Sequence, residues 1–323
     1  MVKLMKITVI GCGRWGSLIT WYLDRIGHTV TLYGRADDPS MIRFLAERRN
    51  DLLTLPESVA LSTDIRCVGE GDAVLISINS QGLRSLLGEL EALHIQNRKF
   101  ILCMKGIEIE TGMRLSQVTE ECVDPSNRVA VWIGPGHVQE FYAGVPNCMV
   151  IDSKDDSLKR ELVEAFSSDL IRFYYGEDLI GNELGAAVKN VIGIAAGMLD
   201  GLGMSTLKGP LMSRGTREVS RLIEAMGGIG NSAYGLCHLG DYEATVFSRH
   251  SHNRHFGEAF VKGEKYTALA EGYYTADAVH RICEKLGVDM PICEGVYDIL
   301  YRGVPAGDAL NALFSRSLKH EMQ

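Results

Sequence analysis

The chain has 323 residues, of which 46% are hydrophobic and 23% charged, a balance typical of a globular protein large enough for two domains. Its net charge of -8 argues against general attraction to nucleic acid or to an anionic membrane, so an anionic ligand would require positive charge concentrated in one place. Its eight cysteines show no CxxC pair and no metal-ligand spacing, which indicates reduced thiols in a cytoplasmic protein and predicts no metal site.

The N-terminal half alternates short apolar runs with amphipathic stretches, and it begins almost directly with a strand rather than with a secretion signal. Helical periodicity is found over residues 15–26 and 81–93. Near-continuously apolar strands separated by helices are typical of a parallel sheet covered on both faces. The predicted strands are residues 6–10, 29–33, 73–78, 99–104 and 128–133, and residues 148–152 and 171–175 are expected to extend the sheet.

From about Leu179 onward the pattern is helical, with no convincing strand. The most apolar run ends at Leu199 and is shorter than the roughly 20 residues that span a bilayer, so we expect a buried helix and no membrane span. The fold class is therefore α/β: a doubly wound, Rossmann-like, mostly parallel sheet over residues 1–178, followed by an all-α domain over residues 179–323. We expect a ligand in the cleft between these domains.

A glycine-rich turn of the form GxGxxG follows the first predicted strand and precedes a helix. The first glycine permits a tight turn, the second lets the backbone approach a pyrophosphate, and the third lets helix and strand pack closely. The helix N-terminus adds N–H groups and a positive dipole end. Because the motif lies inside a βαβ unit, it predicts a dinucleotide site rather than a structural turn. The residues expected at the cofactor here are Gly11, Gly13, Arg14, Trp15 and Gly16.

The residue that follows the second predicted strand bears on the choice of cofactor. Sites that prefer NAD usually carry an acidic residue at this point, whereas this chain has Arg35, with Asp37 and Asp38 just beyond it. An arginine suits the 2′-phosphate of NADP. We therefore expect NADP or NAD, with NADP slightly favoured. A solvated surface arginine is the alternative interpretation.

A dehydrogenase that acts on a secondary alcohol needs a group that accepts the hydroxyl proton as hydride leaves carbon. A lysine serves if burial and a neighbouring cation lower its pKa. Lys189 is the best candidate, with Asn190 beside it to orient a hydroxyl, although a lysine that reaches out from a packed helix is the alternative. The residues that helical spacing places on its face leave room for a ligand: Asn182, Gly185, Gly193 and Ala196.

A second lysine lies where ligands of open α/β sheets bind. Lys105 follows the strand predicted over residues 99–104, and such ligands lie outside the carboxyl ends of the strands. There it would hold substrate and lower the pKa of another lysine nearby. Surface lysines after strands are common, so from the residues alone a solvated surface lysine is the alternative interpretation of Lys105.

Ordered sequence blocks along nearly the whole chain resemble the NAD(P)-dependent glycerol-3-phosphate dehydrogenases. The turn GCGRWG is similar to that family's GxGxWG, and GPGHVQE from Gly134 is similar to GPSFAxE. The helix ELGAAVKNVIGIAAGMLDGLG from Glu183 is very close to the family's central helix. The further blocks are SQGLR from Ser80, MKGIEIETG from Met104, GLCHLGDYEAT from Gly235, AEGYYTA from Ala270 and LGVDMPICEGVYDILYRG from Leu286.

The resemblance implies a homodimeric enzyme that interconverts sn-glycerol 3-phosphate and dihydroxyacetone phosphate with NAD(P). It places the catalytic base on Lys189, with Asn190 beside it. It places the substrate lysine, which also borders the cofactor, on Lys105. The aspartate and threonine near the reacting carbon fall on Asp241 and Thr245. Physically, Asp241 would balance the two lysines and orient Lys189.

The resemblance also places the remaining ligand contacts. The acidic residue that approaches the cofactor falls on Glu271. The loop that closes over phosphate and cofactor falls on Ser251, His252 and Asn253. The segment expected at the substrate includes Gly134 and Gly136.

Three departures from the family's pattern surround the expected substrate. His252 stands where the family has an arginine, so a bidentate contact with phosphate is missing, although Arg249 and Arg254 flank the position. Gly136 and His137 replace a serine and a phenylalanine. After Gly203, MSTLKG replaces the usual segment and is one residue shorter.

These departures leave the class of reaction intact and the identity of the substrate open. A sister dehydrogenase of the same fold, acting on a different small polyol or hydroxy acid, is the first alternative. A nucleotide-binding protein without catalytic activity is the second alternative. If His252 contacts phosphate as an imidazolium, the KM for substrate is expected to rise as pH increases through the histidine range.

Overall fold

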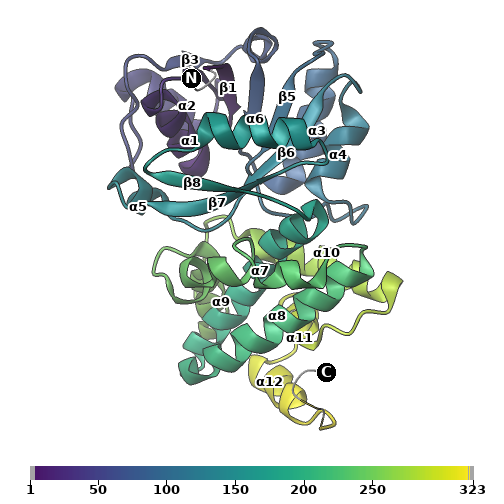
Figure 1. Cartoon of the computed structure of the whole chain (residues 1–323). Helices are drawn as coiled ribbons and strands as arrows, with labels where there is room; N and C mark the ends of the chain where they lie inside the picture. The colour runs from purple at the N-terminus through teal and green to yellow at the C-terminus, as the bar shows by residue number, and fades with distance from the viewer. Residues whose placement is uncertain (1–3, 319, 321–323) are drawn as a thin grey trace.

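The computed structural model describes residues 4–318 and 320, and Figure 1 shows a sheet domain above a helical domain. Eight strands form one sheet in the order β3-β2-β1-β4-β5-β6-β7-β8. All neighbouring strands are parallel except β6 and β7, which are antiparallel. The strands are β1 (Lys6–Ile10), β2 (Thr29–Tyr33), β3 (Ala60–Ser62), β4 (Ala73–Ile76), β5 (Lys99–Leu102), β6 (Arg128–Ile133), β7 (Asn147–Asp152) and β8 (Ile171–Tyr175).

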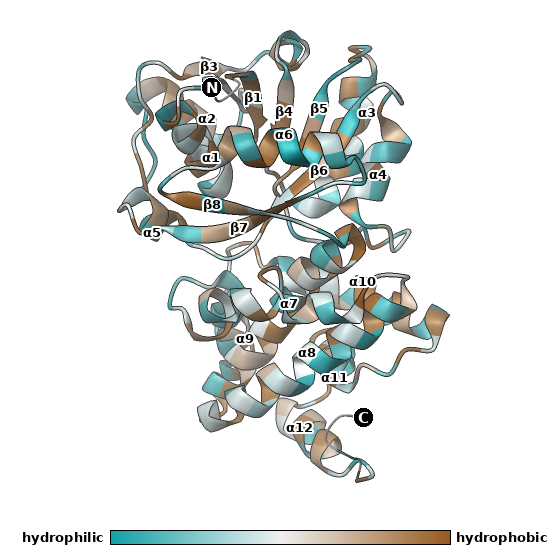
Figure 2. Cartoon of the chain, viewed as in Figure 1, coloured by the Kyte–Doolittle hydropathy of each residue, from teal (hydrophilic) through white to brown (hydrophobic). Residues whose placement is uncertain are grey.

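The order of the strands reverses between β1 and β4, which are neighbours although β2 and β3 lie between them in the chain. Ligands of doubly wound sheets bind at such a point, outside the carboxyl ends of the strands. Both strands are buried over nearly their whole length, and Figure 2 shows hydrophobic residues along them. The strand order therefore places the glycine turn after β1 at the centre of the carboxyl edge.

Six helices belong to the sheet domain, and two of them were predicted from periodicity, namely α1 and α3. The other four were not predicted. Two of them, α4 and α5, have only eight and five residues, whereas α6 with 11 residues is longer than α3 with nine. The helices are α1 (Arg14–Arg25), α2 (Pro39–Glu47), α3 (Leu83–Glu91), α4 (Leu115–Cys122), α5 (Val138–Tyr142) and α6 (Asp156–Phe166).

All seven predicted strands are present, and the α/β class with a helical second half is confirmed. The strands β4 and β5 each end two residues earlier than predicted, where the chain leaves the sheet toward the ligand edge. The prediction missed β3, because this three-residue edge strand is only partly buried and carries no apolar run.

The second half is helical, and no described residue after Tyr175 lies in a strand. The helix α7 lies in the middle of this domain, with α8, α9 and α10 packed around it (Figure 1). The helices are α7 (Leu179–Gly201), α8 (Lys208–Ala225), α9 (His252–Lys262), α10 (Glu271–Leu286), α11 (Pro291–Tyr301) and α12 (Ala306–Phe314).

The helix α7 has 23 residues and is long and apolar enough to cross a membrane, so length alone does not argue against a span. However, 89% of the most apolar 18-residue stretch of α7 is buried inside the structure, as in the core helix of a globular domain. Its buried surface comes from packing against the surrounding helices.

Glycines allow α7 and α9 to approach each other closely. A Cβ atom added at Gly197 of α7 would lie 1.8 Å from the backbone oxygen of Arg254, and one added at Gly257 of α9 would lie 2.1 Å from that of Ile194. Both distances are far shorter than any van der Waals contact. The close packing carries the start of α9 to the side of α7 that bears Lys189 and Asn190.

Candidate active site

The turn after β1 gives each of its three glycines a different role. Gly11 has a φ of +109°, and a Cβ there would lie 2.2 Å from the backbone oxygen of Ser77, just beyond β4. A Cβ at Gly16 would lie 1.9 Å from the backbone oxygen of Gly11. Around Gly13, by contrast, no described atom lies within 4 Å of an added Cβ, so the backbone is open to a ligand. The turn therefore fits a pyrophosphate at the start of α1.

Two lysines from different domains meet at one carboxylate. The Nζ of Lys189, on α7, lies 2.5 Å from Oδ2 of Asp241 and donates a hydrogen bond to Oγ1 of Thr245 at 2.8 Å. The Nζ of Lys105, beyond β5, lies 2.7 Å from the same Oδ2 and donates to the backbone oxygen of Gly134 at 2.7 Å. The structure thus brings together four of the five residues expected at the reacting carbon.

Burial changes the acidity of Lys189. Loss of solvation, opposed by the carboxylate of Asp241 and assisted by the charge of Lys105, lowers the pKa of its ammonium group to about 7. Neutral and charged forms of Lys189 are therefore both populated near pH 7. Such a group can accept a proton from an alcohol and return one to an alkoxide.

The fifth residue, Asn190, is held by a chain of amides. Its Oδ1 accepts a hydrogen bond from Nδ2 of Asn253 at 3.0 Å, and Oδ1 of Asn253 accepts one from the backbone N–H of Gly272 at 2.9 Å. Asn253 therefore joins α7, α9 and α10. Ser251 has a structural role beside it, because its hydroxyl caps α9 by accepting from the N–H of Arg254 at 3.3 Å.

The expected acidic residue reaches back to the sheet domain. Glu271 is the first residue of α10, and its carboxylate accepts hydrogen bonds from the N–H of Ser80 at 3.2 Å and from the Ser80 hydroxyl at 2.6 Å. Ser80 follows β4, at the carboxyl edge of the sheet. Glu271 therefore joins the start of α10 to the carboxyl edge of the sheet.

Comparisons with known proteins agree with this geometry. The N-terminal and C-terminal models of NAD-dependent glycerol-3-phosphate dehydrogenase match residues 6–159 and 178–311. The glycerol-3-phosphate dehydrogenase (NAD(P)+) of Chlorobium phaeobacteroides is 36% identical over an alignment of 335 positions, which covers 98% of this chain and 99% of that protein. The chain belongs to the NAD-dependent glycerol-3-phosphate dehydrogenase family.

Further members and a solved structure of the family extend the likeness over the whole chain. The glycerol-3-phosphate dehydrogenase (NAD(P)+) of Maridesulfovibrio salexigens is 37% identical over 333 residues, covering 98% of this chain and all of that protein. The crystal structure of glycerol-3-phosphate dehydrogenase from Coxiella burnetii superposes with a TM-score of 0.90 at 28% identity, over 97% of this chain and 99% of that one.

The glycine at position 136, one of the departures from the family pattern, has a steric reason. Its φ is +140°, and a Cβ there would lie 2.2 Å from the ring of Phe141. A serine therefore does not fit this backbone. Gly134 also has a positive φ, of +138°, and presents its backbone oxygen to Lys105. Gly134 thus lies beside the lysine pair, and Gly136, two residues further on, packs against Phe141.

His137 is a polar group at the reaction centre that the residue-by-residue reasoning did not assign. Its ring lies 5.5 Å from that of His250, and its Nε2 is buried without a hydrogen-bond partner. Burial lowers the pKa of His137 to about 4, and the charges of His250 and Lys189 add to this effect. The only available signal was its replacement of the family's phenylalanine.

His252 does not stand free to act as an imidazolium. Its Nε2 contacts the guanidinium of Arg14, and its Nδ1 lies 2.8 Å from the Tyr266 hydroxyl. Burial lowers the pKa of His252, and the charge of Arg14 lowers it further. Of the flanking arginines, Arg254 pairs with Asp200 at 2.7 Å and is directed away from this contact.

Two residues expected at the cofactor have other partners here. Arg35 follows β2 as predicted, but its guanidinium lies 2.6 Å from the carboxylate of Glu89, and both side chains are exposed. Trp15 packs its ring against Phe141, with centroids 6.1 Å apart, so it supports the start of α1.

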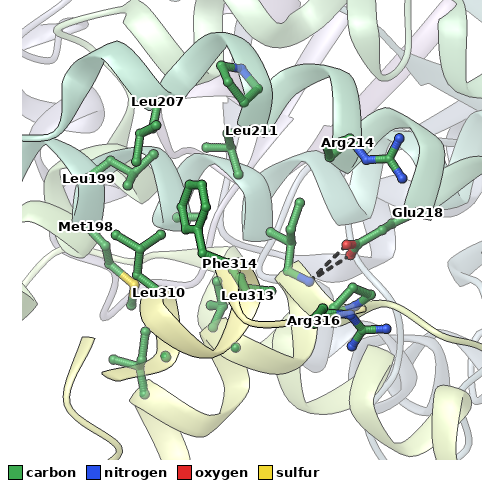
Figure 3. A pocket seen from close by; sticks show the side chains of 18 of the residues that line it. Met198, Leu199, Leu207, Leu211, Arg214, Glu218, Leu310, Leu313, Phe314 and Arg316 are labelled. Carbon is green, nitrogen blue, oxygen red and sulfur yellow. Dashed lines mark hydrogen bonds between the residues drawn. The ribbon is translucent and has the colours of Figure 1, made fainter. Parts of the chain in front are cut away.

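A separate cavity of about 440 Å³ lies within the helical domain, between α7, α8, α11 and α12 (Figure 3). Apolar residues form most of its wall, among them several leucines, Met198 and Phe314. Glu218 lies at one end, where its carboxylate accepts the N–H of Ile292 at 2.9 Å. None of the lysine pair or glycine-turn residues lines this cavity, so it is not the reaction site.

The segment around Asp241 owes its position to two residues that sequence reasoning also missed. His238 is fully buried, and its Nδ1 lies 2.9 Å from the backbone oxygen of Gly185. Its Nε2 lies 2.7 Å from the hydroxyl of Tyr242. This pair ties the segment that carries Asp241 to α7. The signal available in the sequence was the spacing of His238 and Tyr242, which are four residues apart within GLCHLGDYEAT and could therefore contact each other on one face of a helical turn.

Proposed function

We propose that this chain is an NAD(P)-dependent glycerol-3-phosphate dehydrogenase that interconverts sn-glycerol 3-phosphate and dihydroxyacetone phosphate. The observation that carries the proposal is the buried ammonium of Lys189, with a pKa of about 7, joined through Asp241 to Lys105 next to a dinucleotide turn. Relatives at 36% and 37% identity over nearly the whole chain are named for this reaction.

The proton steps follow from the position of Lys189. When bound, the nicotinamide ring accepts or supplies the hydride. In alcohol oxidation the O–H bond at the secondary carbon breaks, and its proton passes to the neutral amine of Lys189 while hydride leaves that carbon. In ketone reduction the ammonium of Lys189 returns the proton to the developing alkoxide. Asn190 is placed to orient the reacting oxygen.

The charges around Lys189 fit this exchange. Asp241 accepts from both lysines, which holds the reacting amine in one orientation, and Thr245 accepts a third hydrogen bond. Lys105 supplies a positive charge at the carboxyl edge of the sheet for the anionic substrate. We assign Lys189, Lys105, Asp241, Asn190 and Thr245 to catalysis on these contacts.

The open backbone at Gly13 and the close packing at Gly11 and Gly16 support dinucleotide binding at the start of α1. Arg35 is available to the 2′-phosphate of NADP, because its ion pair with Glu89 is exposed and such pairs contribute only about 0–1 kcal/mol. We propose that the protein uses NADP or NAD, with NADP slightly favoured. Glu271 and Lys105 border the same cofactor.

We also propose that residues 1–178 bind the cofactor and residues 179–323 complete the substrate site. The last strand ends at Tyr175 and α7 begins at Leu179, and the two family models end and begin at residues 159 and 178. A cytoplasmic homodimer is proposed on the family resemblance. Sedimentation velocity of the purified protein tests the oligomeric state.

Oxidation of NADH and of NADPH, followed by absorbance, tests the reaction. Dihydroxyacetone phosphate is compared with dihydroxyacetone and a panel of other unphosphorylated ketones. Turnover that depends on the phosphate is the expected result. Turnover with an unphosphorylated ketone alone would support a sister dehydrogenase for a different small polyol or hydroxy acid, which Gly136 and His252 favour. Absence of turnover with every ketone would indicate an idle nucleotide-binding protein.

A further inference from the structure

A cavity of about 510 Å³ lies between the glycine turn and the loop that leads into α9. Its described wall is rich in basic groups: Arg14, Arg249, His250, His252 and His255. Asp51 is the single carboxylate among the described residues that line it, and Arg43 neutralises that group at 2.5 Å. In a protein with a net charge of -8, this is a local concentration of positive charge suited to an anion.

The two domains meet in this cavity through Arg14. Arg14 is the first residue of α1, in the sheet domain, and its guanidinium contacts His252, the first residue of α9. Burial is the main influence on the pKa of Arg14, and among the described residues no carboxylate forms an ion pair with it. A guanidinium offers five N–H donors and no acceptor, so most of its donors remain available to a ligand.

We propose that Arg14 is a specificity-determining residue that binds the phosphate group of the substrate from the cofactor-binding domain, with the imidazole of His252 accepting from its guanidinium and holding it in place. The inference rests on the proposed function and adds a residue to it. The guanidinium supplies two parallel N–H donors to phosphate oxygens, a geometry that imidazole alone does not provide.

The position of the cavity favours the substrate's phosphate over that of the cofactor. His252 is followed by Asn253, whose amide contacts Asn190, the neighbour of Lys189. His250 faces His137, and the pKa of His137 responds to Lys189. Asn253 and His250 therefore connect the wall of this cavity with the surroundings of Lys189, although Lys189 is not among the described residues that line it. The pyrophosphate of the cofactor is served by the backbone of the turn at Gly13.

The variant Arg14→Ser tests the proposal. We expect the KM for dihydroxyacetone phosphate to rise at least about tenfold, as for loss of a hydrogen bond to a charged group. We expect kcat/KM for unphosphorylated dihydroxyacetone, and the KM for NADH and NADPH, to stay within about twofold, because those reactions do not use the phosphate contact. Inorganic phosphate serves as a separate probe, and its inhibition constant is expected to rise in the variant.

Two further variants complete the experiment. Arg25→Ser, at the other end of α1, removes an exposed arginine that lies over the ring of Trp21, and it is the matched control with no expected effect. Because Arg14 and His252 touch, the double variant Arg14→Ser, His252→Arg supplies the guanidinium from the opposite side of the contact. We expect it to recover most of the lost affinity for dihydroxyacetone phosphate. If Arg14→Ser fails to fold, Arg14→Lys is used, and an intermediate rise in KM is expected.

Three results would overturn the proposal. A rise in the KM for NADH or NADPH, with phosphorylated and unphosphorylated ketones affected equally, would assign Arg14 to the cofactor. An unchanged KM for dihydroxyacetone phosphate would leave Arg14 outside the site. Absence of turnover of that substrate by the unaltered protein would instead reject the proposed function, and this inference with it.

Discussion

The side chain of Lys189 is only 7% exposed, and its three polar contacts are a carboxylate, a hydroxyl and, through the carboxylate, a second lysine. An ammonium group in that environment loses most of its solvation, so the neutral amine becomes accessible near pH 7. The reactivity of this residue is therefore a property of its surroundings.

Replacing Lys189 with alanine is expected to lower kcat by on the order of 10²–10⁴, the usual contribution of a general acid or base. Binding of the dinucleotide, measured by fluorescence titration, is expected to stay near normal, because the glycine turn lies on another domain. Circular dichroism checks that the variant is folded. Near-normal turnover in a folded variant would show that another group moves the proton.

The activity is expected to depend on pH in opposite ways in the two directions. Oxidation of glycerol 3-phosphate needs the neutral amine of Lys189, so its kcat rises as pH passes about 7. Reduction of dihydroxyacetone phosphate needs the ammonium, so its kcat falls over the same range. Since the carboxylate of Asp241 raises the pKa of Lys189, Asp241→Asn is expected to move both profiles to lower pH.

The position of each profile, rather than its height, is the measurement, because Asp241→Asn also disturbs the orientation of both lysines. Asp277→Asn is the control, since Asp277 lies on α10 and pairs with the exposed Arg281 at 2.9 Å. Profiles that stay in place or move to higher pH in Asp241→Asn would contradict the assignment.

At the scale of single elements, the approach of α7 and α9 depends on glycines that no other residue can replace. Gly197→Ala puts a methyl group into the backbone of α9 at Arg254, and we expect a loss of about 1–3 kcal/mol in the free energy of unfolding. Urea denaturation followed by circular dichroism measures the change.

The matched control is Gly88→Ala on the exposed side of α3, where no described atom lies within 4 Å of the added methyl group. Better helix propensity is expected to leave that variant unchanged or more stable by up to about 1 kcal/mol. Equal stability of the Gly197 and Gly88 variants would mean that α7 and α9 can separate without cost.

Most strands and the long helix α7 could be predicted, because each shows an apolar run or a clear period in the sequence. Length alone does not decide the outcome, since β1 and α5 have five residues each and only β1 was predicted. The strand β3 has three partly buried residues and no apolar run, so it could not be predicted.

At the scale of the molecule, three of the contacts that cross from the sheet domain to the helical domain lie at the site. They join Lys105 to Asp241, Ser80 to Glu271, and Arg14 to His252. Each contact pairs residues more than 100 positions apart in the chain. Apolar packing joins the domains as well, since Ala186 and Cys237 of the helical domain belong to a buried cluster with strand residues of the sheet domain.

Glu271→Ala removes the acceptor of the Ser80 amide and hydroxyl. We expect a fall of about 1–3 kcal/mol in the free energy of unfolding, because these donors lose their partner, and a higher KM for the dinucleotide. Glu284→Ala, an exposed position on the same helix, is the control and is expected to change neither quantity. An unaltered KM in Glu271→Ala would separate Glu271 from the cofactor site.

The sequence by itself determined the class of fold and the glycine turn, because these depend on local spacing: period-two and period-3.6 patterns, and glycines at fixed offsets. It also offered Lys189 as the candidate base. Only the tertiary structure decided that Lys189 and Lys105 share Asp241, that Gly136 leaves no room for a serine, and that Arg14 faces His252. Those facts depend on distances between segments far apart in the chain, which no local pattern encodes.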